Sequence, residues 1–221
     1  MISNQCKLLL YGVGVQQKLI KLKFGNYLKE NSFVIGSPYE SFQKIHNCFN
    51  HSVLFSLQFT SSHTEKENRL FLNKTINFFE NIEQSNLRLK FYVKAHPRHE
   101  NCIDDSKIYN YNFVQRAPES LNECFKLCSL HITEYSTVVF DALMKSIPTI
   151  LTEFSGHLNI LVDEYRFPKI KSKSLIILFK KMEDKTFYQS ICEEQIRWSK
   201  KIYSPFKEDN FKQVLTNNSD K

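Results

Sequence analysis

Short apolar runs alternate with longer amphipathic segments through the middle of the chain. Apolar runs predict buried strands, and apolar residues at helical spacing predict helices. The predicted strands cover residues 53–58, 87–93, 111–115, 130–133 and 149–152. The predicted helices cover residues 65–82, 120–128 and 138–145, and Ser120 and Glu123 have the spacing of a capping box. The alternation predicts an α/β fold with a Rossmann-like, doubly wound parallel sheet and helices on both faces.

The two ends of the chain follow a less regular pattern. Residues 7–11 and 33–35 predict short strands, and residues 174–181 and 186–201 predict amphipathic helices. A change of pattern near residues 46–51 marks the place where we expect a domain boundary.

The composition is that of a soluble globular protein, with 221 residues of which 42% are hydrophobic and 24% charged. No apolar run approaches the ~20 residues that span a bilayer. The apolar patch at residues 8–10 has neither a signal-peptide core nor a small-residue cleavage site. We therefore expect a cytoplasmic protein.

Six cysteines are scattered along the chain without a CxxC pair. Cys124 and Cys128 lie four residues apart in a predicted helix, and no nearby His/Cys pair completes a tetrahedral zinc site. We expect free thiols and no bound metal.

The net charge of +7 favours an anionic partner without identifying it. The lysines are spread along the sequence and form no single block, so a soluble surface with a mild cationic bias explains them equally well. The same bias would suit anionic nucleotides or an acceptor at a membrane surface. A nucleic-acid partner would require a basic stripe, and we do not expect one.

A pair of hydroxyls follows a predicted strand at the point where a helix begins. Ser136 and Thr137 come just after the apolar run 130–133. Open α/β sheets bind ligands at the carboxyl ends of their strands, and free N–H groups at a helix start favour phosphate. Ser and Thr are also ordinary N-cap residues, so capping is the alternative.

A histidine follows another predicted strand in the sequence Lys94-Ala95-His96-Pro97. Because the residue before proline is kept out of the helical region, His96 falls in a turn beyond the strand. Its imidazole could donate to a phosphate oxygen or act as an acid, and a backbone hydrogen bond within the turn is an equally good explanation. Lys94 and Arg98 are nearby cations that solvent would also accommodate.

Two carboxylates flank the hydroxyl pair. Asp141 lies about one turn into the helix and Glu134 precedes the pair, and either could accept hydrogen bonds from ribose hydroxyls. An acidic residue near a helix N-terminus is also stabilised by the helix dipole alone.

The sequence lacks the glycine motifs of two common nucleotide-binding folds. Gly12 and Gly14 lack the third glycine of the dinucleotide fingerprint, because Gln17 stands in its place, and the chain has no Walker lysine motif. A Rossmann dehydrogenase or a P-loop enzyme is therefore not expected.

The sequences KAHPRHE and ITEYSTVVFDALMKSIPTI together resemble the C-terminal half of GT-B glycosyltransferases. The nearest groups are the CDP-glycerol glycerophosphotransferases of teichoic acid synthesis, the bacterial sialyl- and polysialyltransferases and capsule-synthesis proteins. The resemblance covers roughly residues 53–151, and FVIGSPY at residues 33–39 resembles the segment that precedes that half. Many members have Ser-Ser where this chain has Ser136-Thr137.

The resemblance implies the roles of the candidate residues. His96 would contact the donor phosphate and aid the leaving group, and Ser136 and Thr137 would bind the same phosphate. Residues 1–50 would be a remnant of the N-terminal acceptor-side half. Residues 51–221 would form a nucleotide-donor-binding Rossmann-like domain with C-terminal helices. A catalytic base, which the acceptor-side half normally supplies, is not evident in residues 1–50.

These observations predict a nucleotide-activated sugar or polyol transferase of inverting GT-B type in surface polysaccharide synthesis, incomplete as an isolated chain. No cofactor is expected besides the donor itself. Expected partners are a nucleotide-sugar or CDP-polyol donor, a chain that supplies the acceptor half, and the inner face of a membrane through peripheral contact. The alternatives are a non-catalytic nucleotide-binding module or subunit of a split transferase, and a relative of UDP-sugar 2-epimerases.

Overall fold

The computed structural model describes residues 7–10, 12–21, 25–37, 43–61, 63–95, 103–134, 136–154, 169–170, 172–202 and 204–216. The chain divides into two compact units. The smaller unit joins residues 1–42 to residues 196–221, and the larger unit contains residues 43–195. The C-terminal residues thus group with the N-terminal ones, whereas the sequence alone suggests division at residue 50 with the whole C-terminal part in the larger domain.

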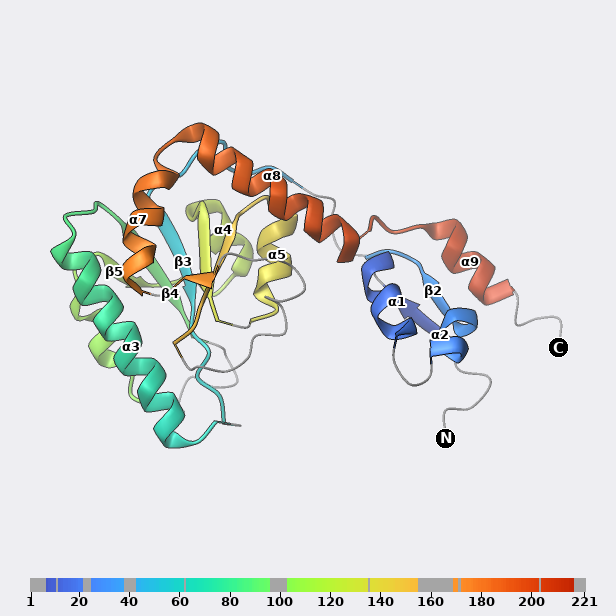
Figure 1. The fold of residues 1–221 in the computed structure, drawn as a ribbon, viewed down its shortest axis with the longest axis horizontal. Helices are drawn as coiled ribbons and strands as arrows, with labels where there is room; N and C mark the ends of the chain where they lie inside the picture. Colours follow the sequence, from blue (N-terminus) through green and yellow to red (C-terminus); the bar gives the residue numbers. More distant parts are fainter. Residues whose placement is uncertain are drawn as a thin grey trace. The chain divides into compact units, whose positions relative to one another are not determined.

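The larger unit contains a six-stranded parallel sheet in the order β5-β4-β3-β6-β7-β8 (Figure 1). The strands are β3 (Ser52–Ser56), β4 (Lys90–Lys94), β5 (Val114–Arg116), β6 (Leu130–Thr133), β7 (Thr149–Thr152) and β8 (Lys169–Ile170). Counted from β3, the order is that of a doubly wound Rossmann sheet. The predicted fold class is confirmed.

Helices cover both faces of this sheet because alternate residues of each strand point to opposite sides. The helices are α3 (Glu65–Gln84), α4 (Leu121–Leu127), α5 (Val138–Met144), α7 (Ser172–Met182) and α8 (Lys185–Ile202), with a 3₁₀ turn at Ser106–Asn110. Val53 and Phe55 face a core that includes buried side chains of α3, α7 and α8, whereas Leu54 packs with α4 and α5. One strand therefore contributes to two separate apolar layers.

Phenylalanines fill the first of these layers. Phe55 lies edge to face against Phe78 and Phe79, with ring centroids 6.0 and 5.9 Å apart, and Phe78 and Phe79 also contact Phe91. These four rings are completely shielded from solvent. Replacing such a buried phenylalanine with alanine lowers the free energy of unfolding by about 3–5 kcal/mol. This aromatic layer makes the sheet a rigid platform.

A capping box begins α3, although the sequence suggests one at Ser120. The Thr64 hydroxyl accepts from the Glu67 backbone N–H at 3.3 Å, and the Glu67 carboxylate accepts from the Thr64 N–H at 2.7 Å. Ser120 precedes α4 but its side chain makes no capping hydrogen bond, so that prediction is wrong. The spacing is the same in both, but only the Thr64 and Glu67 side chains turn toward the free N–H groups.

The four cysteines among the described residues are free thiols, as expected: Cys48, Cys124, Cys128 and Cys192. Burial raises the pKa of Cys192 to about 11 and raises that of Cys128 as well. Both thiols are therefore protonated at neutral pH and contribute to the structure as small apolar groups.

The smaller unit contains a two-stranded parallel sheet of β1 (Leu8–Leu10) and β2 (Ser32–Val34). Its helices are α1 (Val13–Ile20), α2 (Gly25–Asn31) and α9 (Glu208–Thr216), together with the end of α8. Asn210 donates from its side chain to the Val34 carbonyl at 2.9 Å, and Lys7 Nζ donates to the Val214 carbonyl at 3.2 Å. These bonds attach the C-terminal helix to β2 and to the residue that precedes β1.

Gly36 allows the chain after β2 to pass against the C-terminal segment. The neighbouring Ser37 N–H donates to the Ser204 carbonyl at 2.8 Å, and the Lys207 N–H donates to the Ile35 carbonyl at 2.7 Å. Gly36 has φ of 81°, and a Cβ at this position would collide with the Pro205 carbonyl. The backbone therefore requires glycine for both its conformation and its contact.

We predict that Gly36→Ala lowers the free energy of unfolding by about 2 kcal/mol or more, because it adds left-handed strain and a backbone collision. Urea unfolding monitored by circular dichroism measures the change. Gln17→Ala, on the exposed face of α1, is the control and should shift the midpoint little. Equal stability of Gly36→Ala and the control would contradict this account of the segment.

Candidate functional site

The chain reverses its direction of travel across the sheet at β3. From β3 it proceeds outward through β4 and β5, then returns to add β6 on the other side of β3. All three central strands run parallel, so Ser56, Lys94 and Thr133 end them at the same edge of the sheet. Open α/β sheets bind ligands in the crevice at such a switch point. This edge is the candidate site.

The predicted hydroxyl pair lies at this edge, between β6 and α5. Ser136 is buried, and its Oγ accepts a hydrogen bond from the Val138 N–H at 3.2 Å. Thr137 is exposed and its side chain makes no capping bond. The helix start is therefore confirmed, with Ser136 holding the turn while Thr137 is exposed to solvent. A serine hydroxyl that accepts one hydrogen bond can also donate its own proton.

The two carboxylates predicted to hold ribose differ in their surroundings. Glu134 has no exposed surface, whereas Asp141 on α5 is exposed. Partial desolvation by neighbouring atoms nevertheless raises the pKa of the Asp141 carboxyl above its ordinary value. Of these two acids, Asp141 is the one that reaches solvent, and its role toward ribose remains a prediction.

His96 lies outside the described residues, as do Pro97 and Arg98. The strand that precedes it, β4, ends at Lys94, next to the end of β3. The position of β4 agrees with the sequence-based expectation that His96 follows a strand neighbouring the switch point. Its contact with donor phosphate remains a prediction.

A string of buried polar side chains crosses three strands just below the candidate edge. His131 on β6 has Nδ1 3.0 Å from Thr149 Oγ1 on β7 and Nε2 3.0 Å from Ser56 Oγ on β3. The Thr133 hydroxyl also donates to the Ser56 carbonyl at 3.1 Å. Complete burial lowers the pKa of His131 to about 3, so the ring is neutral and donates from one nitrogen while accepting at the other. The string ties the strands together where the site begins.

A hollow of about 560 Å³ lies at the carboxyl ends of β4 and β5. Its lining residues are Val93, Lys94, Ala95, Tyr109, Arg116, Ala117 and Glu119. The Lys94 ammonium donates to the carbonyls of Pro118 and Glu119 at 2.9 and 2.8 Å, which fixes the loop after β5. Lys94 thus has a structural role that its position in the sequence does not reveal.

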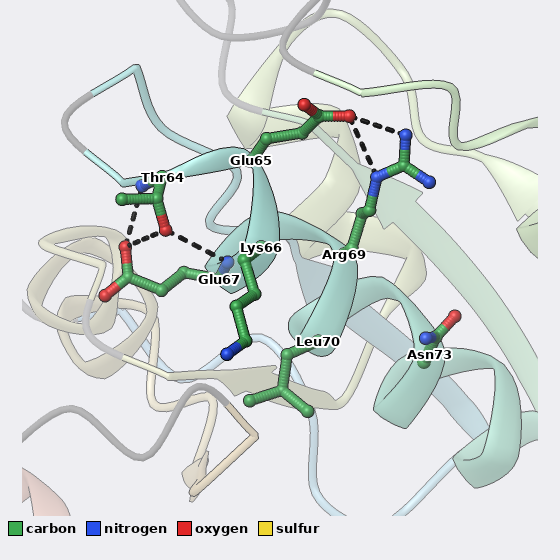
Figure 2. Close-up of a pocket in the computed structure, with 7 residues that line it drawn as sticks. All are labelled: Thr64, Glu65, Lys66, Glu67, Arg69, Leu70 and Asn73. Carbon is green, nitrogen blue, oxygen red and sulfur yellow. Dashed lines mark hydrogen bonds and ion pairs between the residues drawn. The ribbon is translucent and has the colours of Figure 1, made fainter.

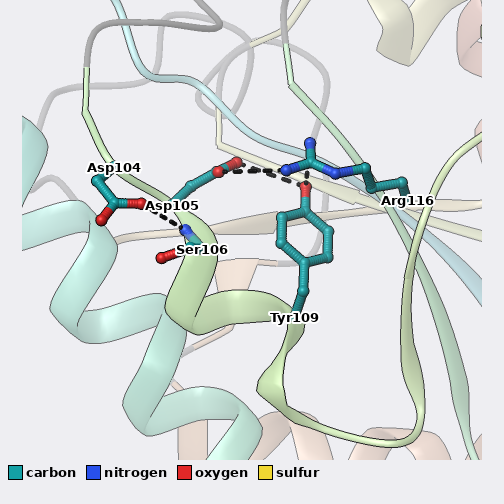
Figure 3. A network of polar contacts seen from close by, with 5 residues as sticks. All are labelled: Asp104, Asp105, Ser106, Tyr109 and Arg116. Carbon is teal, nitrogen blue, oxygen red and sulfur yellow. Dashed lines mark hydrogen bonds and ion pairs between the residues drawn. The ribbon is translucent and has the colours of Figure 1, made fainter.

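Arg116 lies over the Tyr109 ring in the same hollow, with its guanidinium carbon 4.2 Å from the ring centroid (Figure 3). Its Nη2 lies 3.8 Å from Asp105 Oδ1, and its Nη1 lies 3.5 Å from the Tyr109 hydroxyl. The adjacent Asp104 accepts from the Ser106 N–H at 3.0 Å, and that bond lowers the pKa of its carboxyl. The network holds a planar cation at the edge of the hollow. The pairing of Tyr109 with Arg116 is not recognisable from sequence, because it depends on the turn that separates the 3₁₀ helix from β5.

A second hollow, of about 720 Å³, lies along the first turns of α3 (Figure 2). Its walls include the Thr64–Glu67 capping box and Arg69, which pairs with Glu65 one turn earlier. The capping box occupies two of the N–H groups that would attract an anion, and the carboxylates of Glu65 and Glu67 place negative charge in the same turn, so this surface is unfavourable for a phosphate.

Among the described residues, no group of three or more His, Cys, Asp or Glu side chains could hold a metal ion. Within the same part of the chain, no helix is both long and apolar enough to cross a membrane.

The fold is similar to several solved structures. A variant of the wall teichoic acid polymerase TagF superposes with a TM-score of 0.55 at 14% sequence identity, over 96% of this chain and 59% of that chain. The calicheamicin glycosyltransferase CalG4 superposes with a TM-score of 0.55 at 11% identity, over 96% of this chain and 54% of that chain. The GtfA/B complex superposes with a TM-score of 0.52 at 10% identity, over 96% of this chain and 45% of that chain.

The chain has a GT-B-like fold. The predicted resemblance is thus confirmed at the level of the fold, with TagF among the neighbours. The chain spans three-fifths or less of the length of these GT-B structures. No family model and no curated protein matches its sequence.

The buried imidazole predicts a specific pH dependence of stability. Since the folded-state pKa of His131 is about 3 and the ordinary value is 6.5, the unfolded chain binds more protons between these two pH values. The neutral ring contributes fully to the free energy of unfolding above pH 6.5. This contribution is lost as the pH falls toward 3, by up to about 1.4 kcal/mol per pH unit.

Urea unfolding of the wild type and His131→Gln over this pH range measures the effect. The variant should show a shallower decline in the free energy of unfolding, whatever its stability at neutral pH. His51→Asn removes an exposed histidine outside the buried string and is the control for the loss of a histidine as such. Identical slopes for the wild type and His131→Gln would show that His131 titrates normally.

Proposed function

We propose that this chain binds a nucleotide-activated sugar or polyol at the β3/β6 switch point. The transfer would be of inverting GT-B type and would serve surface polysaccharide synthesis. The observation that carries the proposal is the Ser136-Thr137 pair at the carboxyl end of β6, where β6 adjoins the first strand of a GT-B-like Rossmann sheet. Phosphate binding at that place follows the general rule for open α/β sheets.

The donor phosphate would meet three groups of this chain. The Thr137 hydroxyl and the Ser136 hydroxyl would donate to its oxygens, and His96 would reach it from the turn after β4. When the bond between the donor group and the nucleoside phosphate breaks, negative charge builds on the departing phosphate. Hydrogen-bond donors that already point to that position stabilise the charge more in the transition state than in the ground state.

The proposal requires no metal ion. Neutral hydroxyls and an imidazole would take the place of a cation, because the first N–H groups of α5 already donate to oxygens of Ser136 and Thr137. Asp141 or, after a local opening, Glu134 would accept from the ribose hydroxyls.

A cytidine diphosphate donor is the first candidate to test. One neighbouring structure is a TagF variant soaked with CDPG, which superposes on this chain with a TM-score of 0.56 at 13% identity. The sequence resemblance to CDP-glycerol glycerophosphotransferases supports the same choice. The acceptor would be a growing surface polymer at the inner face of the membrane.

A separate chain would supply the acceptor side and the catalytic base. Support for this part comes from GtfA/B, a neighbour whose structure is that of a complex. The second candidate function, a non-catalytic nucleotide-binding subunit, rests on the same observation. Nucleotide binding without transfer or donor hydrolysis by the purified chain favours the subunit.

We expect the chain to bind CMP, CDP or UDP in calorimetry, and we expect Thr137→Val to weaken that binding about ten- to a hundredfold. The estimate follows from the value of a hydrogen bond to a charged group. Thr186→Val, on an exposed threonine at the start of α8, is the matched control and should bind as the wild type does. Failure of the wild type to bind any of the three nucleotides would refute the proposed function.

The role of His96 is tested through turnover. His96→Asn should reduce donor hydrolysis or transfer about a hundredfold or more, because it removes an acid from the leaving-group side. His51→Asn is the control, since His51 lies at the amino end of β3 and has φ of 60°, a conformation that asparagine tolerates. Unchanged nucleotide binding and turnover in His96→Asn would remove the role given to this histidine.

A further inference from the structure

The positive charge of the chain is concentrated in the smaller unit. Residues 1–42 and 196–221 contain eleven Lys and Arg against five Asp and Glu, a net charge of +6. The larger unit contains nineteen basic and eighteen acidic residues, a net charge of +1. Because the two parts of the smaller unit are far apart in sequence, the concentration becomes visible only once the fold joins them.

Exposed apolar side chains gather in the same unit. Of the large hydrophobic residues that are exposed in the described part of the chain, five belong to it: Leu8, Leu9, Val13, Phe206 and Leu215. The larger unit, with more than twice as many residues, contributes Leu70, Leu127 and Ile177. A unit that carries both excess cations and exposed apolar side chains suits the interface of an anionic bilayer.

The end of α8 shows the combination most clearly. Lys200 and Lys201 occupy its last turn, and Arg197 lies one turn earlier on the same exposed face. Lys201 Nζ lies 4.5 Å from the centroid of the Trp198 ring. Phe206 and Lys207 follow within the same unit and are both exposed. Glu193 and Glu194, the nearest acids on the helix, precede this segment and belong to the larger unit.

We propose that the smaller unit binds the surface of an anionic phospholipid bilayer through the end of α8 and the segment after it. Lys200, Lys201 and Lys207 would contact lipid phosphates, while Trp198 and Phe206 would enter the headgroup region. Tryptophan and lysine prefer this region because each combines an apolar body with a polar tip. The inference deepens the membrane part of the proposed function and assigns it to named residues.

An anionic lipid surface explains the residues better than a nucleic acid does. A nucleic-acid surface would account for the lysines, but not for the exposed Phe206 that precedes Lys207 or for the other exposed apolar side chains of the unit. Each Lys or Arg near an anionic bilayer contributes about 1 kcal/mol, or about fivefold in affinity. Several such residues with a few inserted apolar side chains suffice for reversible binding, so no spanning helix is required.

The test uses the full chain and vesicles of phosphatidylcholine with or without phosphatidylglycerol. Trp198 is the single tryptophan of the sequence, so its fluorescence reports directly on the proposed surface. We expect sedimentation with the anionic vesicles alone, a blue shift of the emission, and quenching by lipids brominated on their acyl chains. High salt should release the protein.

Two triple variants with equal net charge distinguish vesicle binding through these particular residues from vesicle binding through the net charge of the whole protein. Lys200→Glu/Lys201→Glu/Lys207→Glu should weaken vesicle binding about a hundredfold or more, from about fivefold for each cation lost. Lys66→Glu/Arg88→Glu/Lys126→Glu, at three exposed positions of the larger unit, should bind almost as the wild type does. Circular dichroism verifies that both variants are folded.

Several outcomes would overturn the inference. These are no binding to anionic vesicles, equal weakening in both triple variants, and tryptophan emission that does not change when the protein sediments. Tighter binding to a DNA or RNA oligonucleotide than to the vesicles would assign the surface to nucleic acid instead. Nucleotide calorimetry is independent of vesicles, so the proposed transferase function can fail while this inference holds, and the reverse.

Discussion

The backbone pairing of β3 with β4 on one side and β6 on the other determines where this protein can bind a ligand. Parallel pairing places the ends of all three strands at one edge, and the change of direction at β3 sends the following loops to opposite sides. Neither loop can cover the gap above β3 and β6. The hydroxyls of Ser136 and Thr137 are brought to that gap because they come directly after β6.

Local patterns predict most of the strands of the sheet. Predicted strands overlap β3, β4, β5, β6 and β7, and the hydroxyl pair marks the start of α5, whereas the two-residue β8 is not predicted. Their order in the sheet was not visible, because periodicity carries no information about which strands pair. The helices α1, α2 and α9 were missed for a different reason. They are short and half-exposed, so their apolar faces are too small to give a clear period.

Long-range contacts account for the remaining differences. Residues 196–221 join the N-terminal unit through bonds such as Lys7 to Val214, whose partners are 207 positions apart. His131 looks like an ordinary residue of a buried strand until Thr149 and Ser56 appear on either side of its ring. Arg116, Tyr109 and Asp105 lie much closer together in sequence, and their network forms because the chain folds back from the 3₁₀ turn to β5.

The polar string through His131 fixes the register of the strands beneath the site, which apolar packing alone would not do. A buried imidazole is costly unless both nitrogens are satisfied, and here each nitrogen has a hydroxyl partner at 3.0 Å. The bonds can form only when β3, β6 and β7 keep their register. A slip of one residue would leave several buried polar atoms without partners, so the alternative registers are strongly disfavoured. The carboxyl edge above the string is therefore fixed in place before any ligand arrives.

The division of charge between the units bears on how an anionic donor would be recognised. A net charge of +7 suggests long-range attraction when it is assigned to the whole chain. With a net charge of +1, the larger unit has almost none of it, so the proposed phosphate site at the switch point would depend on hydroxyls and an imidazole at short range. Such recognition depends on geometry and only weakly on salt. Attraction that is sensitive to salt then belongs to the smaller unit, where cations and exposed apolar side chains occur together. Donor recognition and surface attachment would therefore respond differently to ionic strength, because different physical interactions produce them.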